Sequence, residues 1–169
     1  VLREWDLGTN LENTSAALGV CVLSSEWISE QGQRIPQEPE ISFKECVEEL
    51  SSTYGKVDPL WSERNFIVRG DKKISVQGGP DVLRAIYGRN DDSGDLSAAG
   101  GDGLYIHVSW DKNGLQSSKS IHQYGSSTQD SDSKHYSDQM DLYVGEKYKP
   151  TFFDQKDLAN NTAESYYVP

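Results

Sequence analysis

The stretch Leu104-Tyr-Ile-His-Val-Ser-Trp110 alternates apolar and polar side chains, and the turn-forming stretch Asp111-Lys-Asn-Gly114 follows it. Such alternation is typical of a β-strand, here with Leu104, Ile106, Val108 and Trp110 on one face. A turn of this composition favours a hairpin, so residues 115–124 are predicted to return antiparallel to the first strand. The sequence therefore predicts an antiparallel sheet whose apolar face requires a covering layer.

The segments before this hairpin also indicate strands. Residues 65–76 carry a Gly70-Asp71 turn between two short β-prone runs, which predicts a second hairpin. Gly78-Gly79-Pro80 interrupts the pattern before residues 82–87. Residues 90–103 are polar, rich in glycine and without periodicity, so we expect an exposed, mobile loop there.

Two helices are predicted near the N-terminus. Residues 14–29 place apolar side chains at helical spacing, and Gly32 and Pro36 are expected to end that helix. A second helix is expected to begin at a capping box formed by Ser42 and Glu45 and to stop at Gly55. The apolar stripes of these helices comprise Ala16, Val20, Leu23 and Trp27 in the first, and Phe43, Cys46, Val47, Leu50 and Tyr54 in the second.

The C-terminal third has weaker helix signals. A third helix is expected from about residue 133, with Tyr136, Met140, Tyr143 and Val144 on one side. Asp154 suits the N-cap of a short helix, and residues 160–169 are expected to fray. We find no internal repeat and no linker between two cores. The prediction is a single α+β unit over residues 1–169, in which helices cover an antiparallel sheet.

Composition excludes several function classes. The 169 residues carry a net charge of −11, which argues against nucleic acid and anionic membranes as partners. The sequence also lacks an apolar run long enough for a transmembrane span.

Cys21 and Cys46 both fall in apolar helical stripes, so buried free thiols are the first expectation. The alternative is a disulfide between the two helices, which an oxidising compartment would permit. Neither cysteine belongs to a Cys/His cluster of the kind that binds zinc.

The candidate nucleophile is Ser126, which follows Gly125 at the end of a predicted strand and lies near His122 and His135. The sequence lacks the G-x-S-x-G elbow, so a catalytic triad has little support. His135 is expected to be a structural residue at a helix start.

Metal binding has similarly weak candidates. Asp91, Asp92 and Asp95 supply oxygen ligands, but their spacing does not fit an EF-hand, and a solvated acidic loop is the favoured interpretation. The same interpretation applies to Asp130 and Asp132. His107 and His122 could face each other on paired strands and bind a metal, although structural histidines are more common there. We therefore assign no catalytic, cofactor-binding or metal-binding residue.

Three stretches near the C-terminus form an ordered set: Tyr124-Gly-Ser-Ser127, His135-Tyr-Ser-Asp-Gln139 and Tyr148-Lys-Pro-Thr-Phe-Phe153. Further motifs are Trp5-Asp6, Tyr54-Gly-Lys-Val-Asp58 with Trp61, Gln77-Gly-Gly-Pro80 and residues 120–127. In this order they resemble the penicillin acylase family, whose members are N-terminal-nucleophile amide hydrolases and include acyl-homoserine lactone acylases. The three C-terminal stretches resemble the closing segment of the large subunit.

This resemblance implies a parent enzyme folded as a four-layer α-β-β-α sandwich, exported in bacteria to the periplasm or secreted, and cleaved autocatalytically. A terminal serine would attack the acyl amide, with its own α-amino group as the base and no cofactor. The first residue here is Val1, so the resemblance predicts a C-terminal segment of the large subunit, inactive alone. Its implied partners are the small subunit and the N-terminal part of the large subunit, and the parent would act on a small N-acyl amide.

An alternative function is a secreted binding module without catalytic activity. Trp5, Trp27, Trp61 and Trp110, together with nine tyrosines, offer surfaces on which a ligand could stack.

Overall fold

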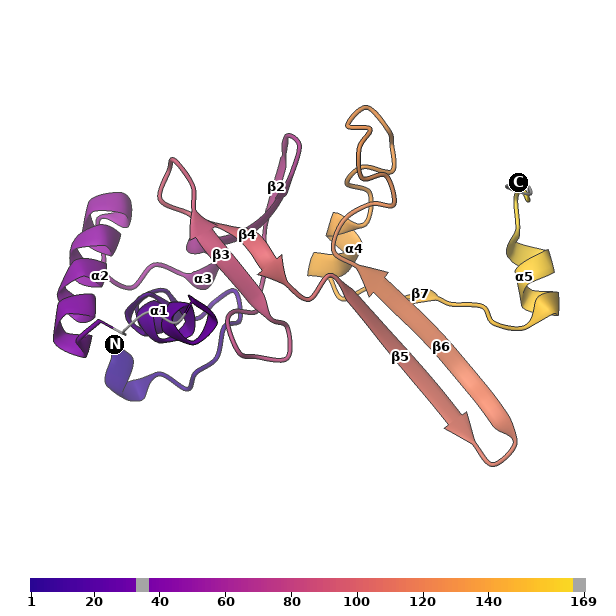
Figure 1. The fold of residues 1–169 in the computed structure, drawn as a ribbon, viewed down its shortest axis with the longest axis horizontal. Coiled ribbons are helices and arrows are strands. Elements are labelled where there is room, and N and C mark those ends of the chain that lie inside the picture. The colour runs from indigo at the N-terminus through magenta and orange to yellow at the C-terminus, as the bar shows by residue number, and fades with distance from the viewer. Residues whose placement is uncertain (33–36, 166–169) are drawn as a thin grey trace.

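The computed structural model describes the backbone of residues 1–32 and 37–165, and the side chains of residues 1–24 and 37–165. The chain has mixed α and β structure. Helices and a four-stranded sheet form one end, and a long β-hairpin projects away from them (Figure 1). A short N-terminal 3-10 helix, η1 (Leu2–Glu4), precedes these elements.

Helix α1 (Ala16–Gly32) confirms the first predicted helix. The Asn13 side chain starts it, because its Oδ1 accepts hydrogen bonds from the backbone N–H groups of Ser15 (2.9 Å) and Ala16 (2.8 Å). The Trp5 ring packs so closely on Gly19 that a Cβ at that position would overlap it. Trp27 and Pro36 lie outside the described side chains and residues.

Helix α2 (Pro39–Tyr54) begins three residues before the predicted capping box. Pro39 occupies its first turn, where the fixed φ of proline favours a helix start. Ser42 is buried inside the helix and donates to Gln37 Oε1 (3.1 Å), so the predicted capping box was wrong. Gly55 ends the helix in the left-handed conformation (φ 69°), as predicted.

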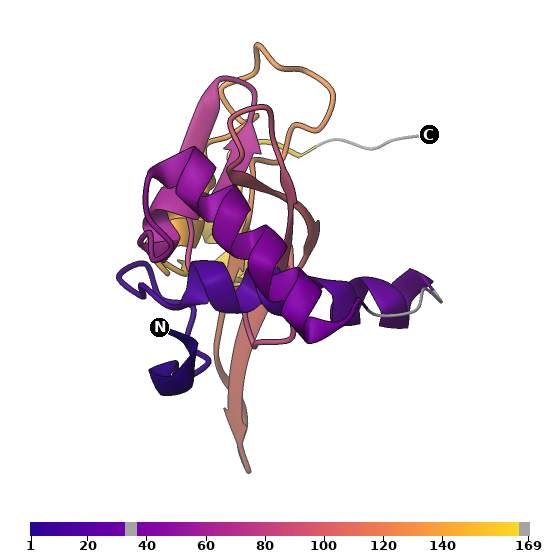
Figure 2. The same ribbon diagram turned by 90° about the vertical axis from the view of Figure 1, so that its left-hand side faces the viewer.

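A disulfide between Cys21 and Cys46 joins α1 to α2. The expectation of free thiols was therefore wrong, and the alternative of an interhelical disulfide is confirmed. Around it, the two helices bury Ala17, Leu18 and Leu50 together with Trp61 of the one-turn helix α3 (Trp61–Arg64). Figure 2 shows α1 and α2 crossing in front of the sheet, as a covering layer.

The four-stranded sheet has the order β2-β1-β4-β3. Its strands are β1 (Asn65–Arg69), β2 (Lys72–Ser75), β3 (Ile86–Asn90) and β4 (Leu96–Gly101). The β1–β2 hairpin confirms the prediction for residues 65–76, whereas the strand anticipated over residues 82–87 begins later, at Ile86.

Residues 90–103 are not a loop, because β4 lies within them and pairs with two neighbours. It runs antiparallel to β3 and parallel to β1, so the sheet is not wholly antiparallel. Its sequence is typical of a loop because Ser97, Ala98 and Gly100 are small and give no alternation. Close approach of the neighbouring backbone requires a glycine at position 101, since a Cβ there would overlap the carbonyl of Ala85.

The second sheet has the order β5-β6-β7 and is wholly antiparallel. Strands β5 (Leu104–Asp111) and β6 (Gly114–His122) confirm the predicted long hairpin, and β7 (Lys149–Pro150) pairs with Lys119 and Ser120 of β6. The face of this hairpin that was expected to pack is exposed, since Ile106 is 54% and Trp110 is 72% accessible.

A second core joins the two sheets. It consists of Ile67, Val76, Ile86, Ile121, Met140 and Tyr143. The last two residues belong to α4 (Met140–Val144), which starts seven residues later than predicted because residues 133–139 form turns. Helix α5 (Gln155–Asn161) begins where expected, with the Asp154 side chain accepting from the N–H of Asp157 (2.8 Å). The predicted fraying tail thus begins inside a helix, and residues 166–169 lie outside the described part.

No described helix combines the length and the apolar character that crossing a bilayer requires.

Candidate functional site

Two of the three C-terminal stretches that resemble the family, Tyr124–Ser127 and His135–Gln139, lie against each other, and we call them the signature segments. The N–H of Gly125 donates to the carbonyl of Tyr136 (3.2 Å), and the N–H of Ser127 donates to that of His135 (3.0 Å). Gly125 is required there, because a Cβ would overlap the carbonyl oxygen of His135. These two backbone bonds therefore close the polar loop of residues 128–134 at its ends.

Arg69, at the end of β1, holds this junction. Its guanidinium lies over the ring of Tyr136 (4.2 Å to the centroid) and that of Tyr124 (5.4 Å). Its Nη2 donates to the carbonyls of Ser127 (3.3 Å) and Thr128 (3.1 Å). One arginine thus ties the signature to the four-stranded sheet.

The candidate serine and histidines are not assembled into a triad. Ser126 is exposed, and among the described residues no hydrogen bond joins it to a histidine. His135 instead pairs through Nδ1 with Asp138 Oδ2 (2.8 Å), and this hydrogen bond holds the pKa of the Asp138 carboxyl below its usual range. His135 thus lies in a run of turns and is bonded to a near neighbour.

His107 and His122 do not face each other. In the β5–β6 register, His107 is opposite Lys119 and His122 is opposite Leu104, so the two imidazoles are on opposite faces of the hairpin. Within the part of the chain that the structure describes, no group of three or more His, Cys, Asp or Glu residues could hold a metal ion.

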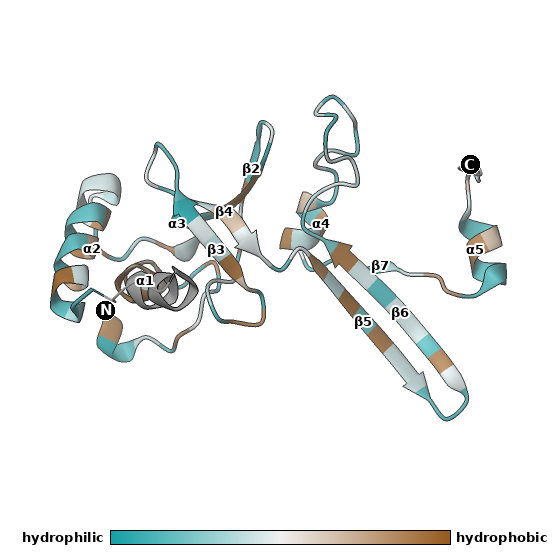
Figure 3. Cartoon of the chain, in the orientation of Figure 1, coloured by the Kyte–Doolittle hydropathy of each residue, from teal (hydrophilic) through white to brown (hydrophobic). Residues whose placement is uncertain are grey.

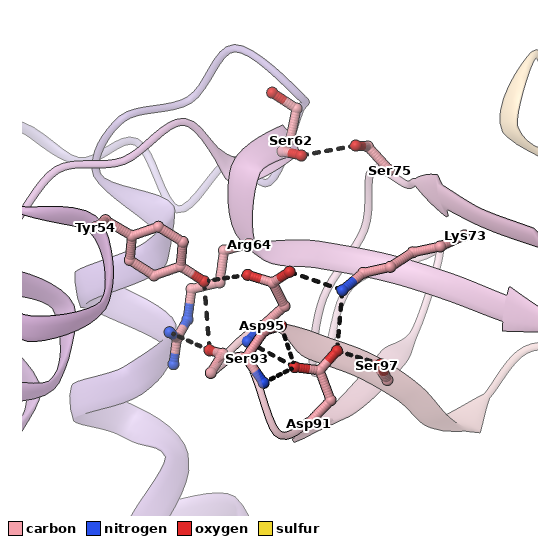
Figure 4. Close-up of polar contacts among 10 residues, drawn as sticks. Tyr54, Ser62, Arg64, Lys73, Ser75, Asp91, Ser93, Asp95 and Ser97 are labelled. Carbon is pink, nitrogen blue, oxygen red and sulfur yellow. Dashed lines mark hydrogen bonds and ion pairs between the residues drawn. The ribbon is translucent and has the colours of Figure 1, made fainter.

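The acidic loop between β3 and β4 is an ordered turn held by a lysine (Figure 4). Lys73 Nζ lies 2.9 Å from Asp91 Oδ2 and 2.7 Å from Asp95 Oδ2. Asp91 Oδ1 accepts from the hydroxyl and N–H of Ser93, and these bonds together with Lys73 hold the pKa of Asp91 far below its usual range. The hydrogen bond to Asp95 is the main cause that raises the pKa of Lys73. The ammonium group of Lys73 therefore lies between the two carboxylates that were the candidate metal ligands.

The same turn is anchored to the helical layer. The hydroxyl of Tyr54 donates to Asp95 Oδ1 (2.8 Å). Burial is the main cause that raises the pKa of Tyr54, and this hydrogen bond is the second. Arg64, whose side chain is 3% exposed, donates to the carbonyl of Gly94 (3.2 Å) and pairs with Glu49 (2.6 Å) on α2. Figure 4 shows Tyr54 and Arg64 reaching the turn from the same side. Arg64 and Glu49 also line a cavity of about 740 Å³ between α1 and the β3–β4 pair.

The penicillin amidase family model matches residues 2–160, which is nearly the whole chain. The chain belongs to this family. No curated protein matches it significantly. The resemblance seen in the sequence is thereby confirmed, and penicillin amidase membership makes the protein a relative of hydrolases.

In this penicillin amidase chain, three arginines that join remote segments were not predicted from the sequence. They are Arg64, Arg69 and Arg84, each of which lies over a tyrosine ring. Arg84 donates to the carbonyl of Tyr143 (3.1 Å) and pairs with Glu146 (3.4 Å). Their partners are remote in sequence, so no local motif could have found them.

Proposed function

We propose that this chain is the C-terminal structural portion of an acylase that hydrolyses N-acyl amide bonds, of the penicillin or N-acyl-homoserine lactone type. Family membership over residues 2–160 carries the proposal. The chain supplies strands and covering helices to an N-terminal-nucleophile sandwich, and the nucleophile comes from another part of the enzyme. The chain alone is therefore inactive.

The arrangement of the signature residues supports this role. Gly125, His135 and Arg69 use their polar groups to hold backbone segments together, and Ser126 is bonded to no base among the described residues. Such a set can position an active site built by other segments. It lacks the nucleophile–base contact that acyl transfer requires.

The proposed compartment is the bacterial periplasm or the exterior. The Cys21–Cys46 disulfide supports it, because structural disulfides persist in oxidising compartments.

The alternative of a binding module has less support. Trp61 is buried and donates to the carbonyl of Gly78 (2.8 Å), and Trp5 packs on α1 and donates to that of Gly8 (2.9 Å). Trp110 is the one described tryptophan side chain that is exposed, so the described tryptophans form no stacking surface.

The test is amide hydrolysis by the purified chain and by the intact product of its reading frame, using chromogenic N-acyl amides. We expect hydrolysis by the intact product alone, with a subunit that begins with Ser, Thr or Cys in N-terminal sequencing. Ser126→Ala and His135→Ala should leave the rate of the intact product within about threefold, because neither residue meets the reacting atoms. Hydrolysis by the isolated chain that is lost in Ser126→Ala would overturn the proposal.

A further inference from the structure

The cavity between α1 and the β3–β4 pair combines an apolar lining with a polar cluster. Its volume of about 740 Å³ lies within the range of small-molecule sites. The apolar lining includes Val20, Trp61 and Ile86. The polar cluster lies where β3 ends, because Asn90 Nδ2 donates there to Glu49 Oε1 (3.2 Å). Figure 3 shows the corresponding change along β3, which passes from brown at its start to teal at its end.

A buried donor in this cluster lacks an acceptor. Arg64 lines the cavity and is only 2% exposed. Its Nη1 donates to the carbonyl of Gly94 and its Nη2 donates to Glu49 Oε1. Its Nε–H has no hydrogen-bond partner in the described part of the chain. Buried donors in proteins are almost always paired, so the Nε–H of Arg64 calls for an acceptor from outside the chain.

An acceptor in the same cluster lacks a donor. Glu49 Oε1 receives the bonds from Arg64 and Asn90. The other oxygen, Oε2, lies 3.9 Å from Cys21 Sγ, a disulfide sulfur that carries no proton to donate. No other described side chain is bonded to Oε2. The cavity thus presents an unpaired donor and an unpaired acceptor on two residues that are bonded to each other.

We propose that this cavity binds a small neutral amide with an apolar body. The carbonyl of the amide would accept from Arg64 Nε, its N–H would donate to Glu49 Oε2, and the apolar body would lie against the apolar lining. A carboxylate would offer an acceptor to Arg64 but would be repelled by Glu49. An amidinium would offer donors to Glu49 but would be repelled by Arg64. The amide group supplies one acceptor and one donor without a charge.

This inference goes beyond the proposed function, since it concerns binding alone and requires no nucleophile. Ser24 lines the cavity, but its hydroxyl donates to the carbonyl of Cys21 (2.7 Å) one turn earlier in α1. Neither signature segment lines the cavity.

The test is isothermal titration calorimetry of the intact product of the reading frame with benzamide, benzoate and benzamidinium. The three probes share one apolar ring and a planar head group, and they differ in charge and in hydrogen-bonding atoms. Chromatography after each titration checks that benzamide is recovered unchanged. Two variants locate the binding. Ala99→Trp introduces a large ring at an exposed position of the cavity lining on β4, and Ser117→Trp introduces the same ring on β6, outside the lining.

We expect benzamide to bind at least about tenfold more tightly than benzoate or benzamidinium. Ala99→Trp should weaken benzamide binding at least about tenfold, and Ser117→Trp should leave it within about twofold. Glu49→Gln should reverse the preference between benzamide and benzoate, because glutamine places an uncharged donor where Oε2 lies. Ala99 is exposed, so its variant remains informative even where Glu49→Gln fails to fold.

Equal affinities for the three probes would overturn the proposal, because the polar cluster would then not recognise the head group. Equal benzamide affinity of the wild-type protein and Ala99→Trp would also overturn it, because the binding would lie elsewhere. The readout does not depend on hydrolysis. A product that hydrolyses N-acyl amides but binds benzamide equally with and without Ala99→Trp would therefore refute this site and keep the proposed function.

Discussion

Removing the Cys21–Cys46 disulfide should lower the unfolding free energy of the chain by an amount set by the length of the loop that the bond closes. The bond links residues separated by 25 positions and joins α1 to α2. In the chain-entropy model, closing a loop of that length lowers the entropy of the unfolded state by an amount worth about 3.5 kcal/mol at 25 °C. Cys46 is buried, so alanine at both positions also forfeits some packing.

The assay is urea unfolding of the oxidised chain, of the same chain with reductant, and of the Cys21→Ala/Cys46→Ala variant. For an m-value of about 2–3 kcal/mol per M, the transition should move down by roughly 1–2 M urea in both perturbed samples. The alanine variant should be destabilised at least as much as the wild-type protein in reductant, because it also loses the packing of the buried Cys46 side chain. The reasoning is refuted if reductant leaves the transition unchanged, or if thiol titration of the untreated protein finds both cysteines free.

Three further perturbations test the site. Arg69→Lys should lower the unfolding free energy, measured by urea titration, by about 2–3 kcal/mol, because lysine cannot stack on two rings while donating to two carbonyls. Arg89 is exposed, so the control Arg89→Lys should lower it by less than about 0.5 kcal/mol. Gly125→Ala should lower the unfolding free energy by about 3 kcal/mol, because the new Cβ would overlap the His135 carbonyl. The control is Gly103→Ala, whose Cβ would meet open space. Equal melting temperatures for the two variants would contradict the close approach of Gly125 to His135. The pKa of Asp91 is lower in the folded chain than in the unfolded one, so its stabilisation is complete above pH ~4 and is lost as pH falls below that value. Asp91→Asn should therefore reduce the fall of the unfolding free energy at acidic pH. An unchanged pH profile would show that the ionised Asp91 carboxylate does not stabilise the fold through Lys73 and Ser93.

Elements whose start, end or turn is set by residues adjacent in the sequence were predictable. The β1–β2 and β5–β6 hairpins have their signals in turns at Gly70 and Gly114, both of which adopt positive φ (58° and 117°). The end of α2 at Gly55 and the start of α5 at Asp154 follow from the same kind of short-range physics.

Elements whose identity depends on neighbours were not predictable. Strand β4 is a strand because β1 and β3 flank it, while its own small side chains carry no periodicity. Ser42 has the sequence context of a helix cap, but Gln37 satisfies it from outside the helix. The site is affected most by this limit, because Arg69 meets Ser127 across 58 positions of sequence.

The closed loop over residues 128–134 has a practical consequence. Backbone hydrogen bonds of Gly125 and Ser127 hold its two ends together, so a change in its length need not alter the packing of the cores. Doubling such a loop adds only about 0.6 kcal/mol of closure entropy. A peptide tag inserted between Gln129 and Asp130 would separate the Ser127 hydroxyl from the Asp130 carbonyl that it bonds (3.1 Å), but the backbone bonds of Gly125 and Ser127 to Tyr136 and His135 do not involve the inserted residues. The loop is thus a position at which a reporter group can be attached away from both cores.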